Sequence, residues 1–176
     1  GGTKLETALT GRYRKGGPTG GTSAGASIAS SVMIAGGKPF TYPRRRSIRL
    51  SAGLGLIQDV IIDQHFRERD RIYRLAAAVM SNPRNLGMGI DEDTALYIEN
   101  GTQATVMGDG TVSVLDGLAL EYSSYAEGHA GKPISIFGLT MHVLADGDGF
   151  DFATRTPIRN EDLQAKIAIP TEDVVQ

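Results

Sequence analysis

The sequence contains no cysteine and no tryptophan, and aromatic residues make up only 6% of its 176 positions. Without cysteine there is no disulfide, no thiol nucleophile and no thiolate metal site. The chain also lacks an apolar run of about 18 residues, which a transmembrane helix requires. Its net charge of −2 supplies no positive field for nucleic acid or for an anionic membrane. We therefore expect neither nucleic acid nor membrane among its partners.

What the chain does contain is material for one globular domain. Hydrophobic residues make up 40% of the sequence and charged residues 22%, which suits a packed core with a solvated surface. Glycine is abundant, with 23 residues, and indicates tight turns and close backbone approaches. We expect a single domain over residues 1–176.

The pattern of apolar residues predicts an α/β fold with a β-rich second half. Helices are expected over 3–14, 24–35 and 67–81. The first of them is capped by Thr3, with Glu6 as its partner. The pairs Asn100-Gly101 and Asp109-Gly110 predict hairpin turns. Strands are expected over 56–62, 88–90, 95–98, 103–107, 111–115, 117–122, 134–139 and 141–144, and the polar tail 170–176 is expected to fray.

The segment Gly21-Thr22-Ser23-Ala24-Gly25 fits the Gly-x-Ser-x-Gly pattern of a nucleophile elbow. Such an elbow exposes a serine hydroxyl on a strained turn before a helix. The backbone N–H of Ala24 would then face the oxygen of a reacting carbonyl, and the helix that follows would add its positive end. A plain Gly/Ser-rich turn that caps a helix is the alternative, and it is favoured by the poor strand signal over residues 15–19.

A nucleophilic serine needs a base, and the sequence offers three histidines: His65, His129 and His142. His65 directly follows the strand expected over 56–62, at the edge where open α/β sheets place their sites. The other two lie in a glycine-rich loop and in an expected strand. A carboxylate should orient the imidazole, and Glu92, between Asp91 and Asp93, is the candidate. An exposed turn explains these three acidic residues equally well.

Three motifs in this order resemble the cyanophycinases, members of a serine-peptidase family that also contains the aspartyl dipeptidases. They are Thr22-Ser23-Ala24-Gly25-Ala26, Asp63-Gln64-His65-Phe66 and Gly89-Ile90-Asp91-Glu92, the second followed by several arginines. The resemblance runs from residue 1 to about residue 158. It implies a glutamine-amidotransferase-like three-layer α/β sandwich with a mostly parallel sheet, whose N-terminal strands are missing from this chain.

The resemblance also implies a function. Ser23 would be the nucleophile, His65 the base and Glu92 the orienting acid, with no metal and no cofactor. The substrate would be cyanophycin, a poly-aspartate that carries arginine on its side chains, cleaved to β-Asp-Arg dipeptides. An aspartyl or isoaspartyl dipeptidase of the same family is one alternative, and a non-catalytic fragment is the other.

Five residues are expected to bind the substrate: Asp63, Gln64, Arg69, Arg71 and Arg74. The spacing of Arg67, Arg71 and Arg74 puts them on one face of the helix expected over 67–81. Guanidinium groups so placed repel one another unless anions pair with them, and carboxylates of the substrate would do so in bidentate fashion. Asp63 would meet a guanidinium of the substrate. The alternative is that the arginines pair with local carboxylates: Glu68, Asp70 or Asp93.

The first residues, Gly1-Gly2-Thr3-Lys4, carry neither an initiating methionine nor the apolar stretch of a signal peptide. Together with the resemblance, this start predicts that the chain is a single, partial catalytic domain of a longer protein. We expect a cytoplasmic location, with a secreted form left open, and a homodimer is left open as well.

Overall fold

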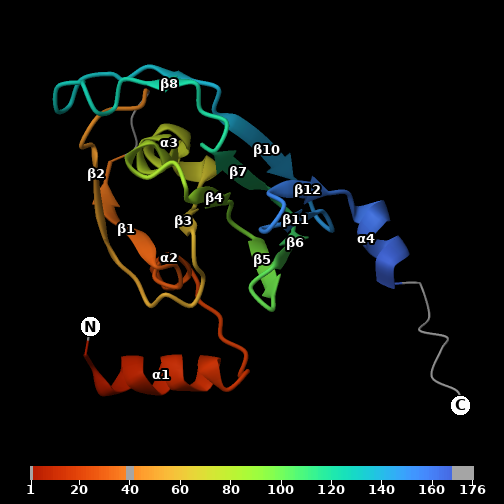
Figure 1. Ribbon diagram of the computed structural model, residues 1–176. Coiled ribbons are helices and arrows are strands. Elements are labelled where there is room, and N and C mark those ends of the chain that lie inside the picture. Colours follow the sequence, from red (N-terminus) through yellow and green to blue (C-terminus); the bar gives the residue numbers. More distant parts are fainter. Residues whose placement is uncertain (1, 39–41, 168–176) are drawn as a thin grey trace, which may run out of the picture.

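The computed structural model describes residues 2–38 and 42–167, which form a mixed α/β fold built mostly of strands (Figure 1). The helices are α1 (Lys4–Arg14), α2 (Ala24–Ser27), α3 (Ile72–Ser81) and α4 (Asn160–Ile167), with a 3-10 helix η1 (Arg67–Arg69). The strands are β1 (Val32–Gly37), β2 (Ile48–Ala52), β3 (Val60–Gln64), β4 (Leu86–Ile90), β5 (Thr94–Glu99), β6 (Gln103–Gly108), β7 (Val112–Asp116), β8 (Tyr122–Ser123), β9 (Ile136–Phe137), β10 (Thr140–Leu144), β11 (Gly149–Asp151) and β12 (Thr156–Ile158).

The central sheet has the strand order β10-β7-β4-β3. Strands β3 and β4 are parallel and are joined through α3, whereas β4 with β7 and β7 with β10 are antiparallel. The expectation of a mostly parallel sheet is therefore not met within the part of the chain that the structure describes. The reason is that a parallel neighbour requires a crossover connection, usually a helix, and only α3 supplies one here, while β5 and β6 occupy the chain between β4 and β7.

The two faces of the central sheet bury separate cores. On one face, Ile61 and Leu115 pack with Leu75 and Val79 of α3. Helix α3 can approach closely because a Cβ on Gly87 of β4 would lie only 2.8 Å from a methyl carbon of Val79. On the other face, a second sheet of order β12-β11-β6-β5 contributes the remaining core residues: Ala104, Val106 and Phe150 against Val60, Ile62, Leu86, Met88, Val112 and Val114. Figure 1 shows α3 and the second sheet on opposite sides of β3 and β4.

One predicted hairpin is confirmed and the other is wrong. Asn100 and Gly101, with φ of 50° and 68°, turn β5 into its antiparallel neighbour β6. Positive φ at both central residues suits this turn, which the Thr102 N–H closes by donating to the Glu99 carbonyl at 3.0 Å. Asp109-Gly110 instead joins strands of different sheets, because β6 pairs with β5 and β11 whereas β7 pairs with β4 and β10. The Asp109 N–H donates to the carbonyl of Asp93 and so continues the pairing of β6 with β5, without pairing β6 with β7.

Of the predicted helices, only the first matches closely. In α1 the Glu6 N–H donates to Thr3 Oγ1 at 3.2 Å, as the cap predicts. The helix expected over 24–35 is wrong, since α2 stops at Ser27 and β1 begins at Val32. Antiparallel pairing of β1 with β2 overrides the modest helix preference of the small residues there. The tail 170–176 lies outside the described residues.

The helix expected over 67–81 is divided into η1 and α3. The dividing residue is Asp70, whose φ of 48° is left-handed and incompatible with a continuous helix. Arg67 therefore does not share a helix face with Arg71 and Arg74, and that prediction is wrong. The strand expected over 56–62 is β3, which begins later, at Val60.

Two features at the periphery connect distant parts of the chain. Helix α1 has no buried residue, stands apart from the sheets in Figure 1, and is held by a 2.7 Å hydrogen bond from the Tyr13 hydroxyl to the Leu56 carbonyl. Asp116, at the end of β7, accepts hydrogen bonds from Arg155 Nε and Nη2 at 2.8 and 2.6 Å, which ties the central sheet to the second sheet.

None of the helices in the described ranges combines the length and the apolarity needed to cross a bilayer.

Candidate active site

Ser23 has the strained backbone of a nucleophile elbow. It precedes α2 with φ of 51° and ψ of −121°, a conformation that costs a non-glycine residue about 1–3 kcal/mol. Its hydroxyl makes no capping hydrogen bond to the helix, so the alternative of a plain helix cap does not describe this turn. Gly21 is sterically required, since a Cβ there would lie 2.3 Å from the carbonyl oxygen of Gly25. A Cβ on Gly25 itself would meet nothing within 4 Å.

The structure brings the serine, the histidine and the glutamate of the three motifs together. Ser23 Oγ lies 3.0 Å from His65 Nε2, and His65 Nδ1 lies 2.7 Å from Glu92 Oε1. Because an ionised carboxylate only accepts, Nδ1 carries the proton and Nε2 of the neutral ring is free to accept from the serine hydroxyl. A serine, an imidazole and a carboxylate in this order are the arrangement that serine hydrolases use.

The parallel pairing of β3 and β4 explains why His65 and Glu92 meet. Gln64, the last residue of β3, is in register with Ile90, the last residue of β4. His65 follows β3 directly and Glu92 lies two residues beyond β4, so both side chains emerge at the same carboxyl edge of the sheet. His65 itself has a left-handed φ of 47°, which turns the chain sharply out of the strand.

The three groups are open to solvent, as a substrate requires. The side chains of His65 and Glu92 are 26% and 49% exposed, and Ser23 is exposed too. The N–H of Ala24 is the first of α2, a position that has no acceptor within a helix. Because α2 is a single turn, this N–H is a local donor, and the long helix expected to add its positive end does not exist.

Asp63 is fully buried beneath this edge and belongs to an internal ion pair. Its Oδ2 accepts from Arg74 Nε at 2.8 Å, and its Oδ1 accepts from Arg74 Nη2 and from the Gln64 N–H. Arg74, 6% exposed, also donates to the Gly37 carbonyl at 2.9 Å, which anchors β1. The charges of Asp63 and Arg74 are thus satisfied inside the protein. Their surroundings favour a scaffold role over the direct substrate contact expected from the sequence.

Arg71 is buried beside this pair and determines how Gln64 is oriented. Its Nη1 donates to the Gln64 carbonyl and, at 3.0 Å, to Gln64 Oε1, and lies 3.4 Å from Asp63 Oδ1. Because a guanidinium only donates, Gln64 must turn its oxygen toward Arg71 and its amide nitrogen away. Burial, and after it the neighbouring charge of Arg74, lowers the pKa of Arg71. The cluster contains two guanidinium groups, Arg71 and Arg74, and one carboxylate, Asp63, so it carries one excess positive charge.

Arg69 differs from the two buried arginines. It ends η1, is exposed, and pairs with no carboxylate among the described residues. The sequence-predicted substrate residues therefore fall into two groups. Asp63, Arg71 and Arg74 lie inside, whereas Arg69 is exposed. Oε1 of Gln64 lies 3.5 Å from Ser23 Oγ, so Gln64 borders the serine hydroxyl.

Sequence reasoning did not identify Glu68 as a contact of the site. Its Oε2 accepts from the Glu92 N–H at 3.2 Å. No local sequence pattern predicts this bond, because its two ends are 24 positions apart and meet only when β3 and β4 pair.

No group of three histidine, aspartate or glutamate residues suited to a metal ion occurs within the described ranges.

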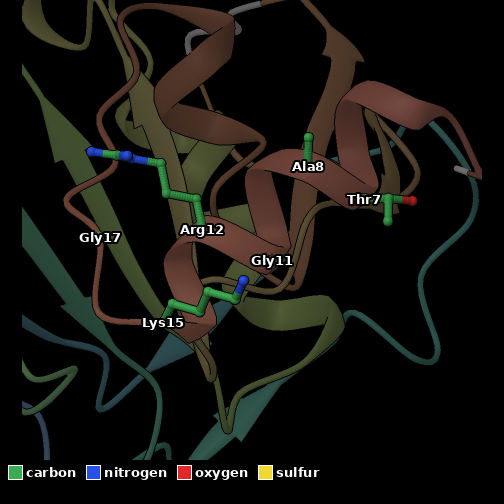
Figure 2. Close-up of a pocket in the computed structure, with 6 residues that line it drawn as sticks. All are labelled: Thr7, Ala8, Gly11, Arg12, Lys15 and Gly17. Atoms are coloured by element: carbon green, nitrogen blue, oxygen red, sulfur yellow. The ribbon is translucent and has the colours of Figure 1, made fainter.

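A separate hollow of about 530 Å³ lies beside α1. Figure 2 shows the Arg12 and Lys15 side chains at its border, with Gly17 on the loop that follows the helix. The residues that line this hollow are Thr7, Ala8, Gly11, Arg12, Lys15 and Gly17. None of them is a residue that the sequence places in the site.

The chain belongs to peptidase family S51, whose model matches residues 1–106. It is similar to the cyanophycinase of Synechococcus elongatus, with 39% identity over 151 residues, 86% of this chain and 45% of that protein. It is also similar to the cyanophycinase of Geminocystis herdmanii, 40% over 139 residues, 79% of this chain and 51% of the relative. The cyanophycinase of Nostoc sp. strain PCC 7120 is 41% identical over 136 residues, 77% of this chain and 46% of the relative. The chain thus spans about half the length of the curated relatives that it matches.

Proposed function

We propose that the protein is a serine exopeptidase that hydrolyses cyanophycin to β-Asp-Arg dipeptides through a triad of Ser23, His65 and Glu92. The observation that carries the proposal is the pair of contacts at His65, 3.0 Å to Ser23 Oγ and 2.7 Å to Glu92 Oε1. Membership in peptidase family S51 and similarity to proteins named cyanophycinase support the reaction class and the substrate.

The first half of the reaction acylates the serine. Ser23 Oγ attacks the scissile carbonyl carbon while His65 Nε2 takes the hydroxyl proton, and Glu92 stabilises the imidazolium that forms. The Ala24 N–H donates to the oxyanion of the tetrahedral intermediate. Collapse of the intermediate breaks the amide bond, and His65 returns the proton to the leaving amine.

The second half releases the acyl group. A water molecule gives a proton to His65 and attacks the acyl-enzyme carbonyl, and the ester bond to Ser23 breaks as the proton passes back to Oγ. The left-handed backbone at Ser23 suits both halves, because it holds Oγ away from the helix and toward the imidazole.

The arrangement of charge around the nucleophile supports an anionic group in the substrate. The two positive charges of Arg71 and Arg74 outnumber the single negative charge of Asp63. Exposed Arg69, the last residue of η1, lies two positions before Arg71 in the chain. We propose that Arg69 pairs with a carboxylate of the substrate and that the Gln64 amide nitrogen, directed away from Arg71, donates to a substrate oxygen. An aspartyl or isoaspartyl dipeptidase would use the same groups on a shorter ligand.

The test is an assay of the full-length protein with purified cyanophycin, in which the released dipeptides are identified by mass spectrometry. We expect β-Asp-Arg from the wild type and none from Ser23→Ala, whose folding should be unchanged because a small residue suits the elbow. An isoaspartyl dipeptide without arginine, tested in parallel, separates the two substrates. Ser23→Ala turnover within tenfold of the wild type would exclude Ser23 as the nucleophile.

We further propose that residues 1–176 are part of one larger catalytic domain. In it, additional strands would extend the central sheet into the mostly parallel three-layer sandwich implied by the resemblance. The coverage of only 45–51% of the relatives supports this interpretation. A structure of the full-length protein with no further strand beside the central sheet would contradict it.

A further inference from the structure

The buried carboxylate of Asp91 has a contact pattern that the three motifs do not explain. Asp91 is only 5% exposed, and both of its oxygens accept hydrogen bonds. Oδ1 accepts from the backbone N–H of Arg67 at 3.0 Å. Oδ2 accepts from the N–H and the hydroxyl of Thr111, at 3.0 and 2.8 Å. Three hydrogen bonds from uncharged donors thus offset the cost of removing this carboxylate from water.

The partners of Asp91 lie on the segments that carry the site. Arg67 is two residues beyond His65, and Asp91 itself directly precedes Glu92. Thr111 directly precedes β7, the neighbour of β4 in the central sheet, and its carbonyl accepts from the Asp91 N–H at 3.2 Å. One side chain therefore connects the loop after β3, the loop after β4 and the start of β7.

Backbone strain explains why the His65 loop needs this support. The left-handed φ of 47° at His65 is unfavourable for a residue other than glycine and persists only where the surrounding structure holds it. The Arg67 N–H is the first of η1, and such an N–H has no acceptor within its own helix. Asp91 supplies the acceptor from another loop, and so fixes the chain immediately after the strained residue.

We propose that Asp91 is a positioning residue, which holds His65 and Glu92 at hydrogen-bond distance by fixing the loops on which both are carried. The geometric part of this inference is independent of the reaction, whereas its consequence for catalysis rests on the proposed function. Asp91 touches neither Ser23 nor the reacting atoms in this account, and it acts through His65 and Glu92.

The geometric part is tested by the tautomer of His65 in the full-length protein, read from imidazole 15N chemical shifts through the carbon-bound ring protons. In the wild type the hydrogen bond to Glu92 should keep the proton on Nδ1. Asp91→Ala should shift His65 toward the Nε2–H tautomer. Asp116→Asn is the matched control, because Asp116 is also a buried carboxylate, 7% exposed, but bonds to Arg155. It should leave the His65 shifts unchanged.

A milder variant covers the case in which Asp91→Ala does not fold. Thr111→Val removes one hydrogen bond to Asp91 Oδ2 and retains the other, so it should produce a smaller shift in the same direction. His65 shifts equal to the wild type in folded Asp91→Ala, or in Thr111→Val when Asp91→Ala is unfolded, would overturn the inference.

The catalytic part is tested by kinetics on cyanophycin. A displaced imidazole should lower kcat of Asp91→Ala roughly 10- to 100-fold and leave KM within about threefold, since substrate contacts remain. An unchanged kcat in the folded variant would overturn the positioning role. If the wild type itself does not hydrolyse cyanophycin, the proposed substrate fails, and the tautomer of His65 still decides the role of Asp91.

Discussion

Nδ1 of His65 lies 2.7 Å from Oε1 of Glu92, and the two residues reach this distance from neighbouring parallel strands. The carboxylate can only accept, so it determines which ring nitrogen carries the proton and leaves Nε2 directed at Ser23. The same carboxylate is 49% exposed, so its interaction with the ring contributes little to folding stability. A loss of function without a loss of stability is therefore expected when Glu92 is changed.

Glu92→Gln should lower kcat roughly 10²- to 10⁴-fold, because the amide keeps the shape of the side chain but not the charge that stabilises the imidazolium. The thermal unfolding midpoint should stay near that of the wild type. Asp93→Asn is the control, since Asp93 is the adjacent exposed carboxylate and asparagine tolerates its left-handed φ of 51°. If both variants lose activity equally, the charge of the loop matters and not the contact with His65.

Arg74→Ala should destabilise the protein strongly. It would leave the carboxylate of Asp63, which is 0% exposed, without its bidentate partner. Breaking a buried ion pair by removing one partner costs about 3–5 kcal/mol. Urea unfolding followed by circular dichroism measures the change. A loss below about 1 kcal/mol would mean that the pair is not needed for the fold.

Arg69→Ala is expected to behave in the opposite way. Because Arg69 is exposed and pairs with no carboxylate among the described residues, its loss should leave stability within about 0.5 kcal/mol of the wild type. If it binds a substrate carboxylate, the lost bond of about 1.5–3 kcal/mol should raise KM roughly 10- to 100-fold with a smaller change in kcat. Unchanged KM for cyanophycin would remove Arg69 from the substrate site.

The two glycines of the elbow should respond differently to alanine. At Gly21 a Cβ would lie 2.3 Å from the Gly25 oxygen and 2.4 Å from the Gly25 carbonyl carbon, both backbone atoms, so the turn must open. We expect Gly21→Ala to lose about 1–3 kcal/mol and most activity. At Gly25 the space is open, so Gly25→Ala should keep kcat/KM within a few fold. Equal activity of the two variants would contradict this account of the elbow.

The Asp116–Arg155 pair predicts a pH dependence of stability. Burial alone would raise the pKa of Asp116, but hydrogen bonds from Arg155 and from the Leu118 N–H outweigh it and hold that pKa below its usual value. A carboxyl with a lowered pKa in the folded state stabilises the fold fully above its unfolded pKa of about 3.9, and this contribution is lost as pH falls through the folded value.

Asp116→Asn should therefore cost about 1.5–3 kcal/mol at neutral pH, and the difference from the wild type should shrink as the pH is lowered below about 4. Free energies of unfolding in urea at a series of pH values measure it. A difference that stays constant down to about pH 2 would show that the charge of Asp116 does not carry the interaction.

Part of the fold could be predicted from local patterns alone. The cap of α1 by Thr3 and the turn at Asn100-Gly101 are confirmed because each depends on a few adjacent residues. Helix 24–35 and the second hairpin failed because partners remote in sequence decided them. Val32–Gly37 pairs with β2, and the strands on either side of Asp109 belong to different sheets.

Local patterns are enough to name the groups that are available to the site: one serine in an elbow pattern, a histidine directly after a strand, and an acidic cluster after the next. How these groups are used depends on contacts between distant parts of the chain. Register between β3 and β4 brings His65 to Glu92, and the left-handed Asp70 ends η1 so that Arg71 and Arg74 turn inward to Asp63. The spacing of the arginines predicts that they share one helix face. Whether they are buried, and what they pair with, depends instead on backbone dihedrals and on residues many positions away. That is why the arginines were expected at a substrate and two of them were found inside the protein.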